Sequence, residues 1–211
     1  MRRASYDRGV EFAEVVRRRR MVRNYDPDRP VPTDVLDRIV GHALRAPSAG
    51  FAQGWDFVVL EETADRDRFW AATTDPTGEP DSWLTGLRRA PCLIICCSDP
   101  GAYLRRYAEP DKGWTDEDAA HWPVPYWDTD TAGAALLMLL SAVDQSLAGL
   151  FFGVPVERIE SVRTAFGIPA DRHLVGVVAL GYPVPDRRSP SLRRGRRGPG
   201  EVVHRGRFGE H

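Results

Sequence analysis

The run Cys-Leu-Ile-Ile-Cys-Cys at residues 92–97 is apolar without interruption and is followed by the turn residues Ser-Asp-Pro-Gly at 98–101. A continuous apolar run of this length, bounded by turn signals, predicts a strand buried on both faces at the centre of a sheet. Outward from it, residues 55–60 and 174–182 predict two more strands, and residues 149–153 predict a short strand or a sharp turn. Residues 92–97 are therefore the expected centre of the sheet.

The segments between these strands carry apolar residues at helical spacing. Residues 33–46 carry apolar side chains at helical spacing and predict the clearest amphipathic helix, with Thr33 as its N-cap and Pro47 as its stop. Strands mixed with helices of unequal length, without regular alternation, indicate an α+β fold, and the length favours a single domain over residues 1–211. Further helices are expected over residues 9–20, 64–72, 82–87 and 156–166, and Val202-Val203 in the tail is strand-like.

Residues 131–147 predict a helix with almost no polar face. A helix that is apolar all round must be buried on all sides. It carries Ser141, Asp144 and Gln145 and falls short of the roughly 20 apolar residues that span a bilayer, so no membrane segment is expected. We expect this helix to be buried partly in the core and partly in an interface between subunits.

The segment at residues 103–127 is irregular and rich in aromatic residues and prolines. A long loop of this composition predicts a lid over a site or a contact with a partner. Its aromatic side chains are Tyr103, Tyr107, Trp114, Trp122, Tyr126 and Trp127.

The composition is that of an ordinary globular protein, with 42% hydrophobic and 28% charged residues, which excludes disordered, collagen-like and coiled-coil classes. The N-terminus is charged and lacks the apolar core of a secretory signal, which predicts a cytoplasmic protein. The net charge of -1 argues against a surface built for nucleic acid.

The cysteines, Cys92, Cys96 and Cys97, all lie in the central apolar run, unlike a disulfide framework or a metal knuckle. They are expected to be reduced core residues. A redox pair of Cys96 and Cys97 is the alternative, although neighbours on a strand point to opposite faces. The histidines match no metal-ligand spacing, so no metal site is predicted.

Basic residues gather near both ends of the chain. Alone, either cluster is more typical of a solvated helix end or tail, and the tail leaves a nucleic-acid contact open. Two separated arginine clusters in a near-neutral protein point to an anionic ligand, because guanidinium groups bind anions through paired, charge-assisted hydrogen bonds. The first cluster is residues 17–20 with Arg23, and the second is Arg187, Arg188, Arg193, Arg194, Arg196 and Arg197.

Four elements, at residues 19–26, 46–55, 149–153 and 179–183, occur in an order that resembles the nitroreductase family of FMN-dependent oxidoreductases, and the resemblance covers nearly the whole chain. Residues 19–26, Arg-Arg-Met-Val-Arg-Asn-Tyr-Asp, resemble the family's R-x-S-x-R/K-x-[FY] element. Residues 46–55 resemble its A-P-S-x-x-N-x-Q-P-W loop. Gly-Leu-Phe-Phe-Gly at 149–153, and Ala-Leu-Gly-Tyr-Pro at 179–183 followed by the basic tail, resemble its closing elements.

This sequence departs from the family pattern at three positions. Met21 stands where a hydroxyl residue is usual, Phe51 where asparagine is frequent, and Gly54 where proline is typical. The resemblance implies that the first change weakens one phosphate contact and that the other two reshape the loop flanking the flavin ring. The family's contacts to the pyrimidine edge of the flavin have no match in residues 71–79.

The resemblance implies a nitroreductase-like homodimer with a central mixed sheet flanked by helices, FMN at the interface, and a tail, residues 183–211, that wraps the partner. It implies that arginines from both ends of the chain bind the FMN phosphate, and that Pro47, Ser48 and Ala49 flank the ring from the partner subunit. The backbone of Phe152 and Gly153 would lie near flavin N5 as the catalytic contact. The cofactor-binding residues implied are Arg19, Arg20, Met21, Arg23, Pro47, Ser48, Ala49, Gln53, Phe152, Gly153, Arg194 and Arg196.

The activity that the resemblance implies is hydride transfer from NADPH or NADH to an electron-poor acceptor, a nitroaromatic or a quinone, by a ping-pong mechanism. A specialised enzyme of the same fold is an alternative: a biosynthetic dehydrogenase, a dehalogenase or a deazaflavin-linked reductase. A third hypothesis is a protein that binds flavin without catalytic turnover. The expected partners are a second copy and a small-molecule acceptor, with neither nucleic acid nor membrane.

Overall fold

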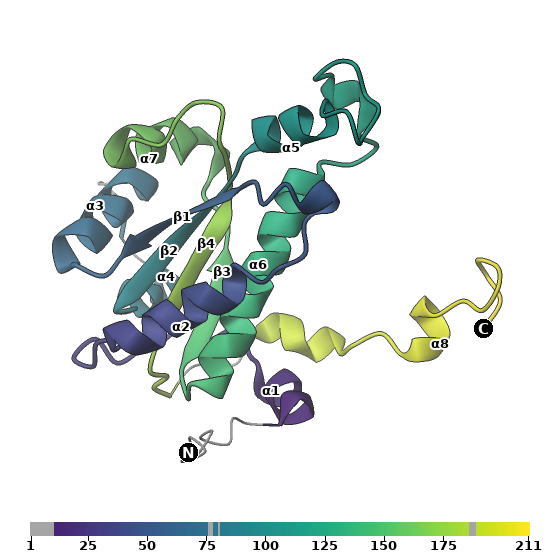
Figure 1. The fold of residues 1–211 in the computed structure, drawn as a ribbon. Helices are drawn as coiled ribbons and strands as arrows, with labels where there is room; N and C mark the ends of the chain where they lie inside the picture. Colours follow the sequence, from purple (N-terminus) through teal and green to yellow (C-terminus); the bar gives the residue numbers. More distant parts are fainter. Residues whose placement is uncertain (1–10, 76–77, 80, 186–188) are drawn as a thin grey trace, which may run out of the picture.

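The computed structural model describes residues 11–75, 78–79, 81–185 and 189–211, and its body is one four-stranded sheet between two layers of helices (Figure 1). In this sheet β2 has a strand on each side and all its residues are buried, which confirms the predicted central strand. The strands, in the spatial order β1-β2-β4-β3, are β1 (Trp55–Leu60), β2 (Cys92–Ser98), β3 (Ala148–Phe152) and β4 (His173–Gly181).

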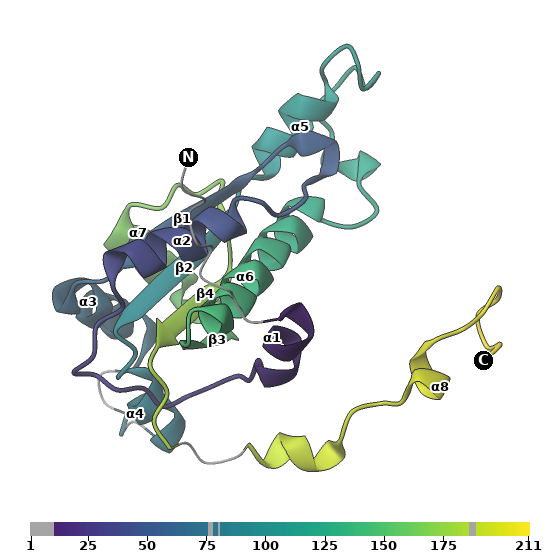
Figure 2. The ribbon, with the colours of Figure 1, turned by 60° about the horizontal axis from the view of Figure 1, so that its bottom comes forward.

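Helices cover both faces of the sheet (Figures 1 and 2). One layer holds α2 (Thr33–Ala43) and α6 (Tyr126–Asp144), and the other holds α3 (Thr63–Thr73), α4 (Ser82–Leu87) and α7 (Ile159–Phe166). Because side chains alternate along a strand, successive residues of β2 enter different cores. Cys92, Ile94 and Cys96 pack with α2 and α6, whereas Leu93, Ile95 and Cys97 pack with the other layer. This arrangement confirms the predicted α+β fold.

The remaining elements are short and lie at the margins of the body or in the tail. They are α1 (Phe12–Arg18), α5 (Pro100–Tyr107), α8 (Pro199–Val202) and 3-10 turns at Ala49–Phe51, Ala119–His121, Val156–Arg158 and Pro190–Arg194.

The predicted mixed sheet is wrong for the strands that the structure describes, because all of their pairings are antiparallel. Parallel pairing is limited to a bridge between Met21 and Gly149 on the outer edge of β3. The segment around Met21 does not continue as a strand along β3. It turns away, and Tyr25 forms an antiparallel bridge with Pro183.

Helix α5 replaces the start of the segment that the sequence predicts to be irregular. Its N-terminus is stabilised by Asp99, whose Oδ1 accepts a hydrogen bond from the Ala102 amide at 3.1 Å, and by Pro100 in its first turn. The next helix, α6, begins at Tyr126 rather than at residue 131.

Two local predictions are also wrong. Thr33 is the first residue of α2 instead of its N-cap, because Pro32 takes the cap position with extended backbone and no side-chain bond. Residues 202–203 were expected to be strand-like, but Val202 ends α8. Pro199 lies in the first turn of this helix, and the Gly198 amide donates to the Glu201 carboxylate at 2.7 Å.

Helix α6 is buried over most of its length but not on every side. Leu136 is 50% exposed, and a Cβ added at Gly133 would meet nothing within 4 Å. The predicted all-round burial is therefore incomplete within a single copy. Of the helices in the described ranges, none combines the length and apolarity needed to cross a membrane.

The tail leaves the body after a short contact with the N-terminal segment. The Val184 amide donates to the Asn24 carbonyl at 3.2 Å, and the Asn24 side chain donates to the Pro185 carbonyl at 2.8 Å. Residues 189–211 then extend away from the body in both views (Figures 1 and 2). Within the described chain, the hydrogen bonds of residues 189–211 stay inside the tail.

The cysteine thiols should be unreactive in the native protein. All are free and buried, and burial raises the pKa of Cys92 to about 12 and that of Cys97 to about 11. Only a thiolate attacks a disulfide reagent.

We expect no fast-reacting thiol when the native protein is treated at pH 8 with 5,5′-dithiobis(2-nitrobenzoate), and we expect all of the cysteines to react in denaturant. Fast labelling of the native protein would contradict this burial. Because thiols in the unfolded chain ionise near 9.0, stability should also fall as the pH rises from 9.

Candidate functional site

The N-terminal motif packs along the outer edge of β3. The Val22 amide donates to the Gly149 carbonyl at 3.2 Å, next to the bridge between Met21 and Gly149. Tyr25 is completely buried, and its hydroxyl donates to the Val22 carbonyl at 2.8 Å. This buried ring holds the segment that carries Arg19 to Arg23 against the sheet.

Helix α4 presses on the same segment. A Cβ added at Gly86 would lie 2.3 Å from the Arg23 carbonyl oxygen, so only glycine permits this contact. The Arg23 guanidinium donates to the Met21 carbonyl at 3.0 Å. On the other side, the Asp26 amide donates to the Tyr182 carbonyl at 2.9 Å. The structure thus brings together the first, third and fourth sequence motifs.

A cavity of about 400 Å³ opens at the end of β3, between α3 and α4. This volume falls within the range of small-molecule sites, roughly 300–1,000 Å³. Phe152 forms part of its wall, with its ring stacked on Trp70 at 5.9 Å and perpendicular to Trp83 at 6.2 Å. Polar and charged groups at the cavity are Thr73, Thr74, Asp75, Glu79, Asp81 and Arg88.

Gly153 lies at this cavity and is open to it. A Cβ added there would meet nothing within 4 Å, in contrast to Gly86. The protein's own packing therefore does not require glycine at this position. A ligand that approaches the backbone closely would require it. Trp70, Trp83 and Arg88 were not predicted as site residues, since no local pattern distinguishes them from helix residues that pack on a sheet.

The arginines at the end of α1 differ in their partners. Arg17 is bound by Glu14 at 2.6 Å, and Arg18 lies 4.0 Å from the same carboxylate. Arg19 and Arg20 form no ion pair with any residue that the structure describes. These two predicted phosphate ligands therefore keep their charge available.

The arginines of the tail show the same division. Arg197 pairs with Glu201 at 3.6 Å, whereas Arg194 and Arg196 are exposed and unpaired within the described ranges. Arg187 and Arg188 lie outside the described residues. A single copy does not join the tail arginines to Arg19 and Arg20, because the tail extends away from the body (Figure 2).

The second motif forms a tightly held turn before β1, which we call the 48–54 loop. The Ala49 amide donates to Asp130 Oδ2 at 2.9 Å, and the Gln53 amide donates to Ser48 Oγ at 3.0 Å. Left-handed backbone occurs at Gly50, Phe51 and Gln53, with φ of 62°, 58° and 52°. Pro47 precedes this turn and is exposed.

Helix α5 clamps the 48–54 loop. Arg106 Nε donates to the Gly50 carbonyl at 2.9 Å, and the Tyr103 hydroxyl donates to Asp130 Oδ2 at 2.8 Å. Burial and this carboxylate raise the pKa of Tyr103. A Cβ added at Gly54 would lie 2.6 Å from the Tyr103 ring, which explains why this chain lacks the family's usual proline there.

The 48–54 loop and Gly153 lie at opposite edges of the sheet. The loop leads into β1 and Gly153 follows β3, with β2 and β4 between them. Three strand spacings amount to roughly 14 Å. Within one copy, therefore, the structure does not bring Pro47, Ser48, Ala49 and Gln53 to Phe152 and Gly153.

Replacing Gly54 with alanine should destabilise the fold, because the new methyl group would collide with Tyr103 and with the Asp99 carbonyl at 2.7 Å. We expect a loss of about 1–3 kcal/mol in urea unfolding. The matched control is Gly41→Ala, in α2, where the methyl group would meet nothing within 4 Å. That change should stabilise by about 0.5–1 kcal/mol. Equal effects of the two variants would contradict the proposed clamp.

Comparison with known proteins bears on this site. A sequence model of the nitroreductase family matches residues 16–182, which include the first three motifs and most of the fourth. A protein of Archaeoglobus fulgidus named as an NADH dehydrogenase/NAD(P)H nitroreductase is 29% identical over 175 residues, covering 82% of this chain and 86% of its own. An iodotyrosine deiodinase of Danio rerio is 23% identical over 206 residues, covering 89% of this chain and 65% of its own.

Solved structures share the fold. An FMN-dependent nitroreductase of Clostridium difficile superposes with a TM-score of 0.65 at 20% identity, covering 92% of this chain and 98% of the other. The family match covers residues 16–182. It includes the segments that line the cavity beside Gly153. This chain belongs to the nitroreductase family and is an NAD(P)H oxidoreductase of that family.

Proposed function

We propose that the chain binds FMN and uses it to pass hydride from a reduced nicotinamide to an electron-poor aromatic acceptor. The observation that carries this proposal is the open backbone at Gly153, beside an aromatic cavity and next to a segment with unpaired arginines. FMN, when bound, supplies the hydride chemistry. The chain supplies position, charge and exclusion of water.

The phosphate of FMN is the anion that the unpaired arginines suit. Arg19 and Arg20 end α1 on the same segment that Gly86 and Tyr25 fix against β3. Planar guanidinium groups offer two parallel donors to a phosphate, and each bond to a charged group contributes about 1.5–3 kcal/mol. Arg23 would lie towards the ring, where its positive charge favours the reduced, anionic flavin.

The end of β3 suits the reacting edge of the flavin. With no Cβ at Gly153, the amides of Phe152 and Gly153 can approach a planar ring closely. The cavity beside them has a wall of aromatic rings, which would shield that edge of a bound flavin from water. No side-chain acid or base is required, because the proposed role of the protein is to hold the donor and the acceptor in turn.

A second copy would complete this site. The 48–54 loop cannot reach Gly153 within its own chain, and Leu136 leaves an apolar face of α6 exposed. The tail, which carries Arg194 and Arg196, also has exposed apolar side chains, Leu192 at 70% and Phe208 at 93%. We therefore propose a homodimer in which the 48–54 loop of each copy, with Pro47, Ser48 and Ala49, flanks the partner's flavin.

Removing Arg19 should release the cofactor without unfolding the protein. Purified protein should show flavin absorbance near 450 nm, and Arg19→Gln should weaken FMN affinity about 10- to 100-fold, from the loss of a charge-assisted bond. Arg17→Gln is the matched control, since Arg17 is engaged by Glu14. Wild-type protein that takes up no FMN, or equal retention by both variants, would overturn the phosphate assignment.

The acceptor can be tested by alternating reduction and oxidation of the bound flavin. NADPH or NADH should bleach the flavin, and a nitroaromatic or quinone should restore it over many cycles, with parallel lines in double-reciprocal plots. The deiodinase relative favours dehalogenation as a second candidate. Restoration by an iodophenol with iodide release, but not by a quinone, would support that candidate. A single bleach without turnover would indicate a flavin-binding protein.

A further inference from the structure

Phe51 has a conformation that its side chain does not favour. Its φ is 58°, in the left-handed region that asparagine and glycine enter readily and that phenylalanine rarely adopts. Asparagine is frequent at this position in the family pattern. The ring is also 76% exposed, so burial within its own chain does not offset the strain.

The backbone of the 48–54 loop is held in place on both sides of Gly50. Ala49 is bonded to Asp130, the Gly50 carbonyl to Arg106, and a Cβ added at Gly50 would lie 2.6 Å from the Tyr107 ring. Behind the loop, Trp122 contacts five other rings at centroid distances of 4.6–6.0 Å. The backbone that carries Phe51 is therefore held on an ordered support, from which the ring projects.

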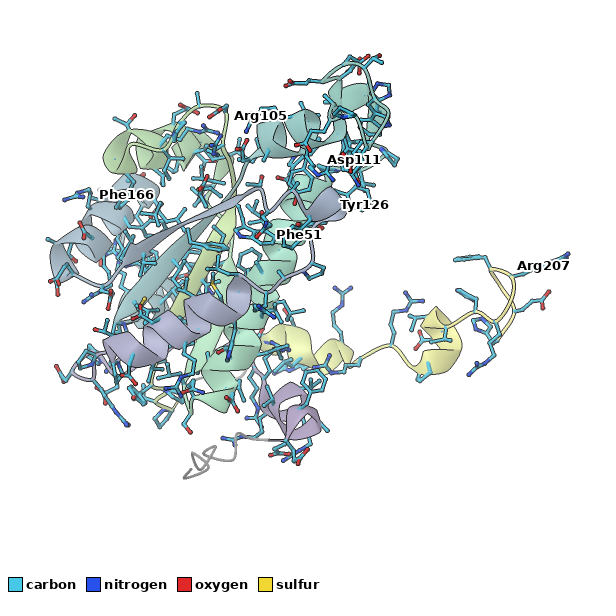
Figure 3. All side chains as sticks on the ribbon, viewed as in Figure 1. Phe51, Arg105, Asp111, Tyr126, Phe166 and Arg207 are labelled. Atoms are coloured by element: carbon cyan, nitrogen blue, oxygen red, sulfur yellow. The ribbon has the colours of Figure 1, made fainter. Side chains whose placement is uncertain are left out.

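Its location places the ring away from its own chain's cavity. Figure 3 shows Phe51 on the segment that enters β1, at the end of the molecule where Tyr126 and α5 lie. The cavity beside Gly153 lies at the opposite edge of the sheet. Strained residues that the surrounding structure holds in place occur preferentially at ligand sites. The ring is therefore free to contact a second copy or a ligand bound there.

We propose that Phe51 is a specificity-determining residue that offers an aromatic face to acceptors in the flavin site of a second copy. This inference rests on the proposed flavin dimer. An amide at position 51 would favour acceptors with polar edges, whereas a phenyl ring stacks on extended, uncharged aromatic acceptors such as naphthoquinones. The chain thus gains preference for planar apolar acceptors at the cost of backbone strain.

The first test compares Phe51→Asn with Phe51→Tyr in flavin-loaded enzyme. An aromatic stacking contact corresponds to about a 3- to 10-fold change in affinity. We expect Phe51→Asn to raise the KM for 1,4-naphthoquinone by this factor and to leave the KM for ferricyanide, a non-planar anion, unchanged. Phe51→Tyr keeps the ring and should retain both values. Because asparagine tolerates this φ, the Tm of Phe51→Asn should equal or exceed that of wild type.

A binding measurement separates recognition from turnover. Titration of oxidised enzyme with 2-naphthol, a planar aromatic that accepts no hydride, should perturb the flavin absorbance. The Kd for 2-naphthol should rise with Phe51→Asn by the same 3- to 10-fold and should not change with Phe51→Tyr. Unchanged Kd and KM in Phe51→Asn that retains its flavin would overturn the role of Phe51 and leave the proposed function standing.

A mixed dimer tests whether the ring acts across the interface. One chain carries Arg19→Glu and loses its own flavin, and the other carries Phe51→Asn and keeps its flavin. If Phe51 serves the partner, the loaded site faces an intact Phe51 and has the wild-type KM for naphthoquinone. If it serves its own chain, the loaded site has the raised KM of Phe51→Asn, and the proposal is wrong. Absence of flavin from wild-type protein would instead remove the proposed function itself.

Discussion

Guanidinium groups without a carboxylate partner are the feature on which the proposed site depends. Arg17 and Arg197 are bound by Glu14 and Glu201, whereas Arg19 and Arg194 have no ion pair among the residues that the structure describes. Arginines at both ends of one chain thus remain available for an anion. Nearby cations repel one another unless an anion lies between them, so a bound phosphate would stabilise their convergence.

The order of strands in the antiparallel sheet is the reason that the proposed flavin site needs a second copy of the chain. Its two edges carry different parts of the family pattern, with the 48–54 loop at β1 and the open backbone of Gly153 beyond β3. Each edge is shaped by local packing: Gly54 admits the Tyr103 ring, and Gly86 admits the Arg23 carbonyl. The two halves are thus formed rigidly and apart. A flavin site that uses both requires the loop of one copy to meet the β3 edge of another.

The sequence predicted those parts of the fold that depend on local apolar patterning. The central strand followed from an uninterrupted apolar run, and α4 followed from residues 82–87. Helix α5 was missed because it is only 8 residues long and because Asp99-Pro100, which begins it, also resembles a turn that ends a strand. The first and last motifs lie side by side, since Tyr25 and Pro183 pair, whereas the convergence of their arginines on one phosphate stays a prediction.

Features that arise from tertiary contact were beyond sequence patterns. The cavity needs Trp70 from α3, Trp83 from α4 and Phe152 from β3, and none of these residues is distinctive in its own segment. The strain at Phe51 likewise shows only in the backbone angle. The departures at Phe51 and Gly54 were visible in the sequence, but their meaning depends on the helix that packs beneath the loop.

The central claim is that guanidinium groups surround a doubly charged flavin phosphate. Phosphorus-31 NMR of the FMN-loaded protein between pH 5 and pH 8 tests it most directly. A free phosphate monoester takes up its second proton near pH 6. Surrounding arginines should hold the phosphate as a dianion, so the account predicts a resonance whose chemical shift stays constant over this range. A resonance that titrates near pH 6, as in free FMN, would contradict it.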